Sequence, residues 1–440
     1  MIMKKYFTYF LCIAIALTGC RKETDPVFDR SPDERLNETL QRYQQVLTGA
    51  LNGWNGTVET ALGITYSFYF RFNDSNRVVM YSDFDSTTAS VSRESSYRLK
   101  ALQQPSLLFD TYSYIHILAD PDASVNGGYY GSGLVSDFEF SIDSVADDHV
   151  SLTGRFNSSK ARFKKATAQE QAAWENKEIL KAQQSLRSLN NILNYFKRLT
   201  YEGVQYEIRV DTLFKQVVFT WLDESGNAQT VTVGYYYVPG GITLSKPVGD
   251  ITGFSIGAWN GSTSTLQVQV GGKPASIAGA IQPIQPDEQA GKRWWQIAVS
   301  QQGYWFSPNG FHVNGIDDAF NLRSLQTDTS QYYYLVYLPG IQPQSGPGYD
   351  VMMPFFYFPA LNAIDFNYGT AHTIEFRNDG RVLFRYLGDL TVGEHPVSGP
   401  AHQTRVQLYD SYGYWFVQTG ANSFDMVSAK DAKTWASWRL

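Results

Sequence analysis

Short alternating runs of aromatic and β-branched residues, separated by polar turn residues, recur along this chain. Residues 66–84 read YSFYFRFNDSNRVVMYSDF, residues 216–233 read QVVFTWLDESGNAQTVTV and residues 372–386 read HTIEFRNDGRVLFRY. Alternation with a period of two is typical of a β-strand with one buried face, and two such runs joined by a polar turn indicate a hairpin. Aromatic residues make up 15% of the chain and charged residues only 18%, which favours a β-rich fold. We therefore expect a mainly β protein built from antiparallel barrels or sandwiches.

Five further strand-like runs lie between residues 95 and 166. They are SSYRLKA (95–101), SLLFDTYSYIHIL (106–118), SDFEFSI (136–142), HVSLTGRF (149–156) and KARFKKA (160–166). Consecutive strands usually pair with their neighbours in sequence, which predicts a meander. The rhythm of this stretch resembles the lipocalin-like barrels of Bacteroidetes lipoproteins, so we expect the first β domain to be lipocalin-like.

An amphipathic helix is expected before each β region. Ser31 and Glu34 form a capping box with a proline start, and residues 167–170 (TAQE) form a second one. The apolar stripes behind them are Leu36, Leu40, Tyr43, Leu47 and Ala50, and then Ile179, Ala182, Leu186, Leu189, Leu193 and Phe196. The predicted domains are a helix with a lipocalin-like barrel at 31–166 and a helix with a larger β region at 167–440. In an alternative division, the larger region splits at the proline-rich stretch 281–291.

The N-terminus has the layout of a lipoprotein signal peptide at residues 1–20. Lys4 and Lys5 precede an apolar stretch at 6–17 that is too short to span a bilayer, and the sequence LTGC ends at Cys20. This lipobox predicts that Cys20 is lipidated, that a tether follows at 21–30, and that acyl chains hold the protein on a membrane. An uncleaved anchor with a chance cysteine is the alternative. The sequence RKETD after Cys20 resembles the charged export signal of Bacteroidetes surface lipoproteins.

Composition argues against several classes of site. Cys12 is lost with the signal peptide and Cys20 is lipidated, so the mature chain keeps no thiol for a disulfide, a zinc–thiolate site or a nucleophile. The net charge is −6 and no dense Lys/Arg tract occurs, which argues against nucleic acid as a partner. The sequence names no cofactor.

Residues 111–122, TYSYIHILADPD, are the first candidate site. If the segment is a strand, Tyr112, Tyr114 and His116 share one face, and that face could line a ligand pocket with aromatic walls. The alternative is an ordinary strand whose isoleucines face the core. Asp120 and Asp122 are most simply a turn, with an irregular cation site left open.

Two catalytic motifs are matched only in part. Residues 253–257 fit the pattern G-x-S-x-G, but a nucleophile elbow needs a helix after its serine, and AWNGSTSTLQVQV follows instead. Glu394, His395 and His402 could offer metal ligands, although proline and glycine indicate an exposed loop. We therefore predict neither a catalytic residue nor a metal site.

Aromatic clusters are the second candidate feature. They lie at 235–237, 294–295, 332–334 and in two copies of GYWF at 303–306 and 413–416. We expect each GYWF copy to follow a strand. Consecutive aromatic residues in a strand point to both faces, so Trp305 and Trp415 are candidates for stacking on a flat ligand such as a sugar. Packing between sheets is the alternative.

Three further stretches of the first half carry a resemblance to a known family. They are ESSYRLKALQQPSLLFDTYSYIHILADPD, the NGG that follows it, and GSGLVSDFEF. With the lipobox, they resemble an uncharacterised family of Bacteroidetes lipoproteins that carry a domain of unknown function, over roughly residues 20–200. Such proteins are typically encoded beside SusC/SusD-type receptors, and the resemblance brings no catalytic residue.

The function that this resemblance implies is a non-catalytic accessory of nutrient uptake. The expected protein is a lipoprotein on the surface of the outer membrane, or on its periplasmic side, that binds a nutrient beside a TonB-dependent receptor. The alternatives are a hydrolase of glycans or peptides and an adhesive or structural surface protein.

Overall fold

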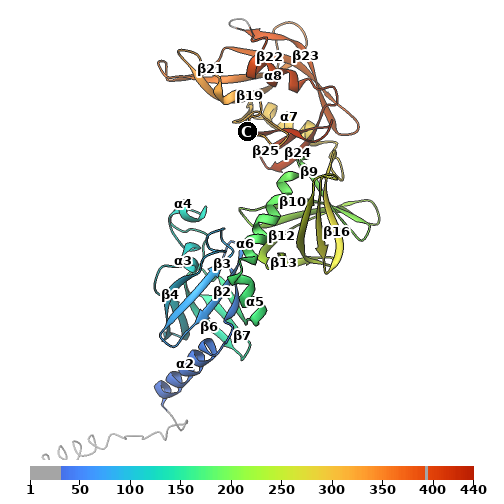
Figure 1. The fold of residues 1–440 in the computed structure, drawn as a ribbon. Coiled ribbons are helices and arrows are strands. Elements are labelled where there is room, and N and C mark those ends of the chain that lie inside the picture. The colour runs from blue at the N-terminus through green and yellow to red at the C-terminus, as the bar shows by residue number, and fades with distance from the viewer. Residues whose placement is uncertain (1–30, 392–394) are drawn as a thin grey trace, which may run out of the picture.

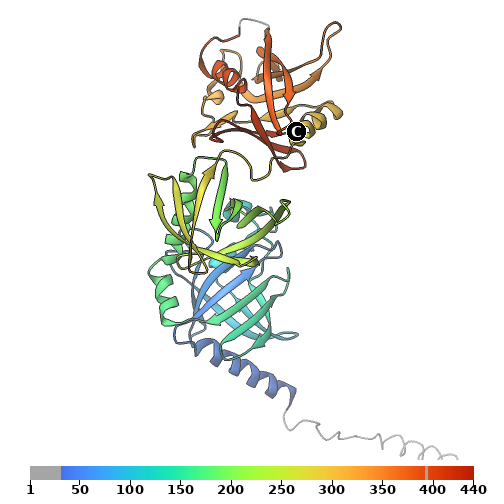
Figure 2. The same ribbon diagram turned by 90° about the vertical axis from the view of Figure 1, so that its right-hand side faces the viewer.

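The computed structural model describes residues 31–391 and 395–440, so the signal peptide, the tether and Cys20 lie outside the described residues. The fold is mainly β, as expected, and consists of two closed eight-stranded antiparallel barrels followed by a third sheet. The three units follow one another along the long axis of the molecule (Figures 1 and 2). Among the described helices, none has the length and apolar character needed to cross a bilayer.

The first barrel is the predicted meander, preceded by helix α2. The elements are α2 (Pro32–Thr48), β1 (Trp54–Glu59), β2 (Thr65–Phe72), β3 (Arg77–Ser82), β4 (Arg93–Ala101), β5 (Pro105–Phe109), β6 (Glu139–Val145), β7 (His149–Gly154) and β8 (Lys160–Lys165). Each strand pairs with the next, and β8 closes on β1. The alternation at 66–84 places Phe68, Phe70 and Phe72 in the barrel core. Helix α2 begins at the predicted capping box between Ser31 and Glu34.

The prediction of a strand across residues 111–118 is wrong. The strand ends at Phe109, and helices α3 (Tyr114–Ile117) and α4 (Ala123–Asn126) follow. The helical turn is fixed by His116, whose Nδ1 accepts the backbone N–H of Ser113 at 3.1 Å and whose Nε2 lies 3.1 Å from the carbonyl oxygen of Phe109. The turn directs Ile115 and Leu118 into the barrel core, a placement that strand alternation could not give.

The second barrel follows two helices instead of the single helix expected. The elements are α5 (Ala168–Glu175), α6 (Glu178–Arg187), η1 (Ser188–Asn191), β9 (Phe196–Tyr201), β10 (Val204–Asp211), β11 (Gln216–Leu222), β12 (Ala228–Val238), β13 (Gly241–Val248), β14 (Ile251–Asn260), β15 (Thr265–Val270) and β16 (Lys273–Ala280). The helix breaks at Lys177, which has a left-handed backbone with φ of 62°. Ile179, Ala182 and Leu186 of the predicted stripe pack into the core of this barrel. Strand β16 closes on β9.

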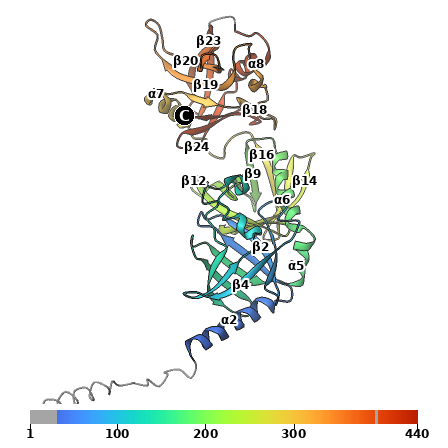
Figure 3. The same cartoon turned by 90° about the vertical axis from the view of Figure 1, so that its left-hand side faces the viewer.

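The third unit is a ten-stranded sheet with two helices. The elements are α7 (Ala290–Ser300), β17 (Trp305–Ser307), β18 (Phe311–Val313), η2 (Leu322–Ser324), β19 (Gln331–Ile341), β20 (Tyr349–Phe358), β21 (Ala363–Phe366), β22 (Tyr368–Phe376), β23 (Arg381–Thr391), α8 (Gly399–Leu408), β24 (Tyr414–Gly420), β25 (Ser423–Ser428) and β26 (Thr434–Arg439). Region 167–440 thus holds two units, and the chain passes between them within the proline-rich stretch (Figure 3).

The two GYWF copies follow helices, α7 and α8, and not the strand-like runs expected. Their side chains also face opposite ways. On β17, Trp305 enters the core of the third unit, whereas on β24 Tyr414 and Phe416 do so. Trp415 therefore points to the other face of the sheet, where it packs with Phe196 of the second barrel.

Candidate functional site

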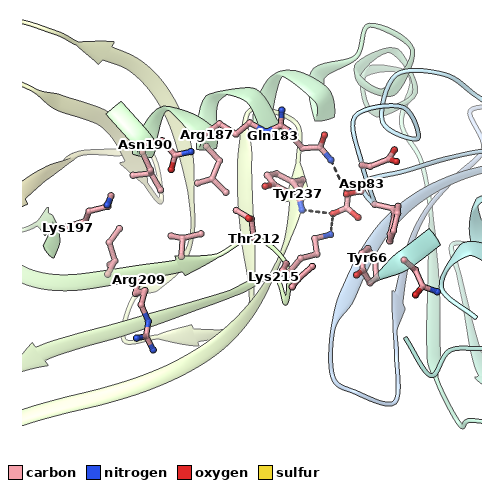
Figure 4. A pocket seen from close by; sticks show the side chains of 18 of the residues that line it. Tyr66, Asp83, Gln183, Arg187, Asn190, Lys197, Arg209, Thr212, Lys215 and Tyr237 are labelled. Carbon is pink, nitrogen blue, oxygen red and sulfur yellow. Dashed lines mark hydrogen bonds and ion pairs between the residues drawn. The ribbon is translucent and has the colours of Figure 1, made fainter. Parts of the chain in front are cut away.

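A cavity of about 510 Å³ lies between the two barrels. Its walls come from the segment after β3, from α4, from α6 and η1, and from β9, β10 and the turn that follows β10. Figure 4 shows Asp83 and Lys215 meeting at one end of this inter-barrel cavity and Lys197 at the other, with Thr212 between them. The volume falls in the range that binds small organic ligands in other proteins.

A buried ion pair joins the barrels at one end of the cavity. The ammonium of Lys215 lies 2.6 Å from Asp83, and the two side chains are 4% and 0% exposed. Asp83 also accepts the backbone N–H groups of Ser67 at 2.9 Å and Tyr237 at 2.8 Å. Burial lowers the pKa of Lys215 from its ordinary value, and the charge of Asp83 opposes that shift. The pair thus connects the two barrels through two side chains that are both shielded from solvent.

The turn after β10 brings Lys215 to this position. Asp211 accepts the backbone N–H groups of Leu213 and Phe214 at 2.9 Å each, which closes the turn. Lys215 then adopts a left-handed backbone with φ of 49°, a conformation that costs a residue with a side chain about 1 kcal/mol. Its ammonium lies 4.2 Å from the ring centre of Tyr66 in the first barrel. The ion pair and this ring contact offset the backbone strain.

The remaining charges around the cavity are mostly positive. Arg187, Lys197 and Arg209 line it, and within the described residues none of them has a carboxylate within 4 Å. The ammonium of Lys197 donates to the carbonyl oxygen of Asn194 at 3.1 Å, and burial lowers the pKa of this lysine. Asp85 is the only lining carboxylate besides Asp83 among the described residues. The cavity is thus more positive than a chain of net charge −6 would suggest.

The remaining wall mixes apolar and polar side chains and contains one buried polar atom without a partner. Apolar lining comes from Leu186, Leu189, Ile208, Val210 and Leu213. Gln183 of α6 donates from Nε2 to the backbone oxygen of Asp83 at 3.0 Å, while its Oε1 is buried without a hydrogen-bond partner. Such unsatisfied buried groups are uncommon in proteins and often lie at functional positions.

Two other cavities adjoin the second barrel. One of about 490 Å³ lies beside α5, where Arg162 and Lys164 are matched in number by Asp148 and Glu170. The other, of about 420 Å³, lies between the second barrel and the third unit and shares Lys197 and Arg209 with the inter-barrel cavity. Of these three cavities among the described residues, the inter-barrel cavity combines a buried ion pair with an excess of cations, so we take it as the candidate site.

The first set of predicted site residues lies outside this cavity. Tyr112, Tyr114 and His116 are absent from its lining, although Asn126 of the neighbouring α4 belongs to it. His116 stacks between Tyr112 and Phe138, with ring centres 5.6 and 4.7 Å away. Burial lowers the pKa of His116, and both ring nitrogens have backbone partners. This histidine therefore holds a loop together.

Trp305 and Trp415 are both buried. The structure does not bring them together with Tyr112, Tyr114 and His116. The indole N–H of Trp305 donates to the carbonyl oxygen of Trp294 at 3.0 Å, inside the third unit. Partly exposed rings do occur close by, since Tyr304, Tyr334 and Phe355 form a cluster in which each pair of ring centres lies about 6 Å apart. The aromatic clusters therefore contain surface rings, but these are the tyrosines and a phenylalanine, not the tryptophans.

The residues of the two partial motifs lie on a strand, in and beside a helix, and outside the described residues. Ser255 lies within β14, so no strand–turn–helix elbow surrounds it. His402 lies on helix α8, where an exposed loop was expected, and Glu394 is outside the described residues. Within the described part of the chain, no three His, Cys, Asp or Glu side chains are grouped as a metal would need.

Sequence reasoning missed Asp83, Lys215 and Lys197. Asp83 and Lys215 are 132 positions apart, and no spacing rule connects them. A weak signal existed for Asp83, because a carboxylate directly after the alternating run of β3 stands at a strand end, where sites often form. Lys197 lies in a strand-like run and carries no signal of its own.

A family model for a domain of unknown function, DUF4302, matches residues 24–257. The chain belongs to the DUF4302 family. The match covers more than half of the chain, and all residues that line the inter-barrel cavity fall inside it. The cavity is therefore part of the DUF4302 region, whereas the third unit lies beyond it.

Other comparisons add no function for this DUF4302 protein. No curated protein matches the chain. A DUF3598 protein of unknown function from Nostoc punctiforme is 11% identical, with 58% of this chain and 99% of that chain covered and a TM-score of 0.15. The Helicobacter pylori beta clamp bound to a DNA ligase peptide is 9% identical, with 92% and 97% covered and a TM-score of 0.15. TM-scores this low define neither a shared fold nor a shared function.

Proposed function

We propose that this DUF4302 protein is a lipid-anchored outer-membrane lipoprotein that binds a small nutrient ligand in the inter-barrel cavity. It acts beside a TonB-dependent receptor and faces the cell exterior. The single observation that carries the binding role is the cavity itself, with its unpaired cations, apolar wall and free Gln183 Oε1. The lipobox at Cys20 and the family resemblance support the location and the uptake system.

The bonding of Asp83 favours binding over catalysis. A general base must lie within hydrogen-bond reach of the substrate proton that it takes, and the side chain of Asp83 is 0% exposed. Both oxygens of Asp83 already accept donors, which are Lys215 and two backbone N–H groups. The pair is therefore part of the wall of the site and not a reacting group.

A thermal-shift screen of residues 21–440 against glycans, peptides, haem and organic acids tests the proposal. A ligand that binds only the folded state at a hundred times its dissociation constant adds about 2.7 kcal/mol. The substitution Thr212→Trp places an indole in the cavity from an exposed turn and should abolish the shift. Thr232→Trp, on an exposed stretch of β12 away from the cavity, should keep it.

The outcomes separate the candidate functions. A ligand that is recovered unaltered and is lost only in Thr212→Trp supports binding at this cavity. A ligand that is recovered cleaved supports the hydrolase instead. A shift that survives Thr212→Trp, or no shift across the panel, contradicts the proposed site.

A further inference from the structure

From the charges and the apolar wall of the inter-barrel cavity, we infer that its ligand is an organic anion: a carboxylate, sulfonate or phosphate on an apolar body. This inference rests on the proposed binding function and adds the chemical class of the ligand. It is argued below from three features of the cavity.

The first feature is the excess of positive charge. Four cationic side chains and two carboxylates line the cavity, and Lys215 and Asp83 cancel each other. Arg187 and Lys197 remain in the lining, while the guanidinium of Arg209 points away from the cavity (Figure 4). The other lining carboxylate, Asp85, is exposed and accepts the backbone N–H of Thr88 at 2.7 Å. A concave site lined by one sign of charge raises the local concentration of ligands of the opposite sign.

The second feature is the supply of unused donors. An ammonium has three donors and a guanidinium five. Lys197 uses one donor on Asn194, and Arg187 has no hydrogen-bond partner within the described residues. Lys197 projects from β9, opposite Ile208 of β10, so a rigid strand holds it. Charge-assisted hydrogen bonds to an oxyanion are among the strongest that such side chains make.

The third feature is the size of the cavity, which exceeds what a bare inorganic ion would fill, together with the apolar side chains in its wall. Val210 and Leu213 of the lining are not buried, and a phosphate or sulfate ion would leave them in contact with water, whereas Leu186 and Ile208 are already buried. A volume of about 510 Å³ accommodates an organic molecule with several rings or a short chain. An anion attached to an apolar body could cover Val210 and Leu213 and also reach the cations.

Two fluorescent probes of the same shape test the inference. 8-Anilinonaphthalene-1-sulfonate is an aromatic anion, and N-phenyl-1-naphthylamine is the same ring system without the sulfonate. Both are titrated into residues 21–440 at low and high salt. The anionic probe should bind roughly tenfold or more tightly than the neutral one, because charge-assisted bonds of this strength correspond to at least that factor. The preference should shrink as salt screens the cations.

Variants place the binding in this cavity. The double substitution Arg187→Gln and Lys197→Gln should remove the preference for the sulfonate and leave the neutral probe unchanged. Of the three cavities described above, Arg187 lines only the inter-barrel cavity. Arg187→Gln alone should therefore weaken the binding of the anionic probe. Lys246→Gln, at an exposed position on β13, is the matched control and should change neither probe.

The results distinguish this inference from the function on which it rests. If both probes bind equally and Thr212→Trp blocks both, the cavity binds ligands but the anionic class is wrong. If the sulfonate preference survives the double substitution, the preference arises elsewhere and the inference is also wrong. If neither probe binds, the binding function itself fails.

Discussion

At the scale of single residues, the Asp83–Lys215 pair is the most consequential contact in the two barrels. Its partners are buried, bridge the two barrels, and lie at one end of the inter-barrel cavity. We expect Asp83→Asn to lower the free energy of unfolding by about 3–5 kcal/mol, because an unpaired ammonium remains buried. Urea denaturation measures this loss. The double variant with Lys215→Met should lose less than the sum of the single variants, and an additive result would contradict the coupling.

His372 makes the third unit sensitive to acid. Burial lowers its pKa to about 3, well below the ordinary 6.5. Between these values the unfolded chain binds a proton that the folded chain does not, so stability falls as the pH drops from 6.5 towards 3. Melting temperatures at pH 7 and pH 4.5 should therefore differ less in His372→Gln than in the native chain. An equal difference between the two pH values in both proteins would contradict this role of His372.

At the scale of elements, the break between α5 and α6 shows a local strain that can be relieved. Lys177 is in the left-handed region, where glycine has no steric penalty. We expect Lys177→Gly to raise the free energy of unfolding by up to about 1 kcal/mol. Gln184→Gly, at an exposed position inside α6, should lower it by about 1 kcal/mol. Chemical denaturation of the two variants side by side checks the contrast, and a loss in both would contradict it.

The elements also show how far sequence reasoning reached. Hairpins, capping boxes and the first meander were predictable because each depends on residues close in sequence. The segment at Tyr112, Tyr114 and His116 was misread because a side chain–backbone bond of His116 overrides its alternation. The GYWF copies show that equal sequence does not fix which face is buried, since Trp305 and Trp415 face opposite sides. The cavity could not be predicted, because its walls meet only when two barrels pack.

At the scale of the whole molecule, the expected location depends on Cys20, which lies outside the described residues. We expect Cys20→Ser to abolish incorporation of a labelled fatty acid and to move the protein from the membrane fraction to the soluble fraction. Labelling and fractionation of cells that express each form measure this. Protease treatment of intact cells then tests surface exposure, and complete protection of the native protein would contradict an outward-facing position.

The closed second barrel has a practical consequence for anyone who isolates the family region. The family match ends at residue 257, within β14, whereas the barrel closes only through β15 and β16 onto β9. A fragment cut at that residue would leave β14 and β9 as two open sheet edges with unpaired backbone groups. Such edges can form hydrogen bonds with the edges of other copies of the chain. Such a fragment should form aggregates on expression, while one that ends after Ala280 keeps every strand of the barrel paired. The boundary of sequence similarity is thus not a boundary at which this protein can be divided.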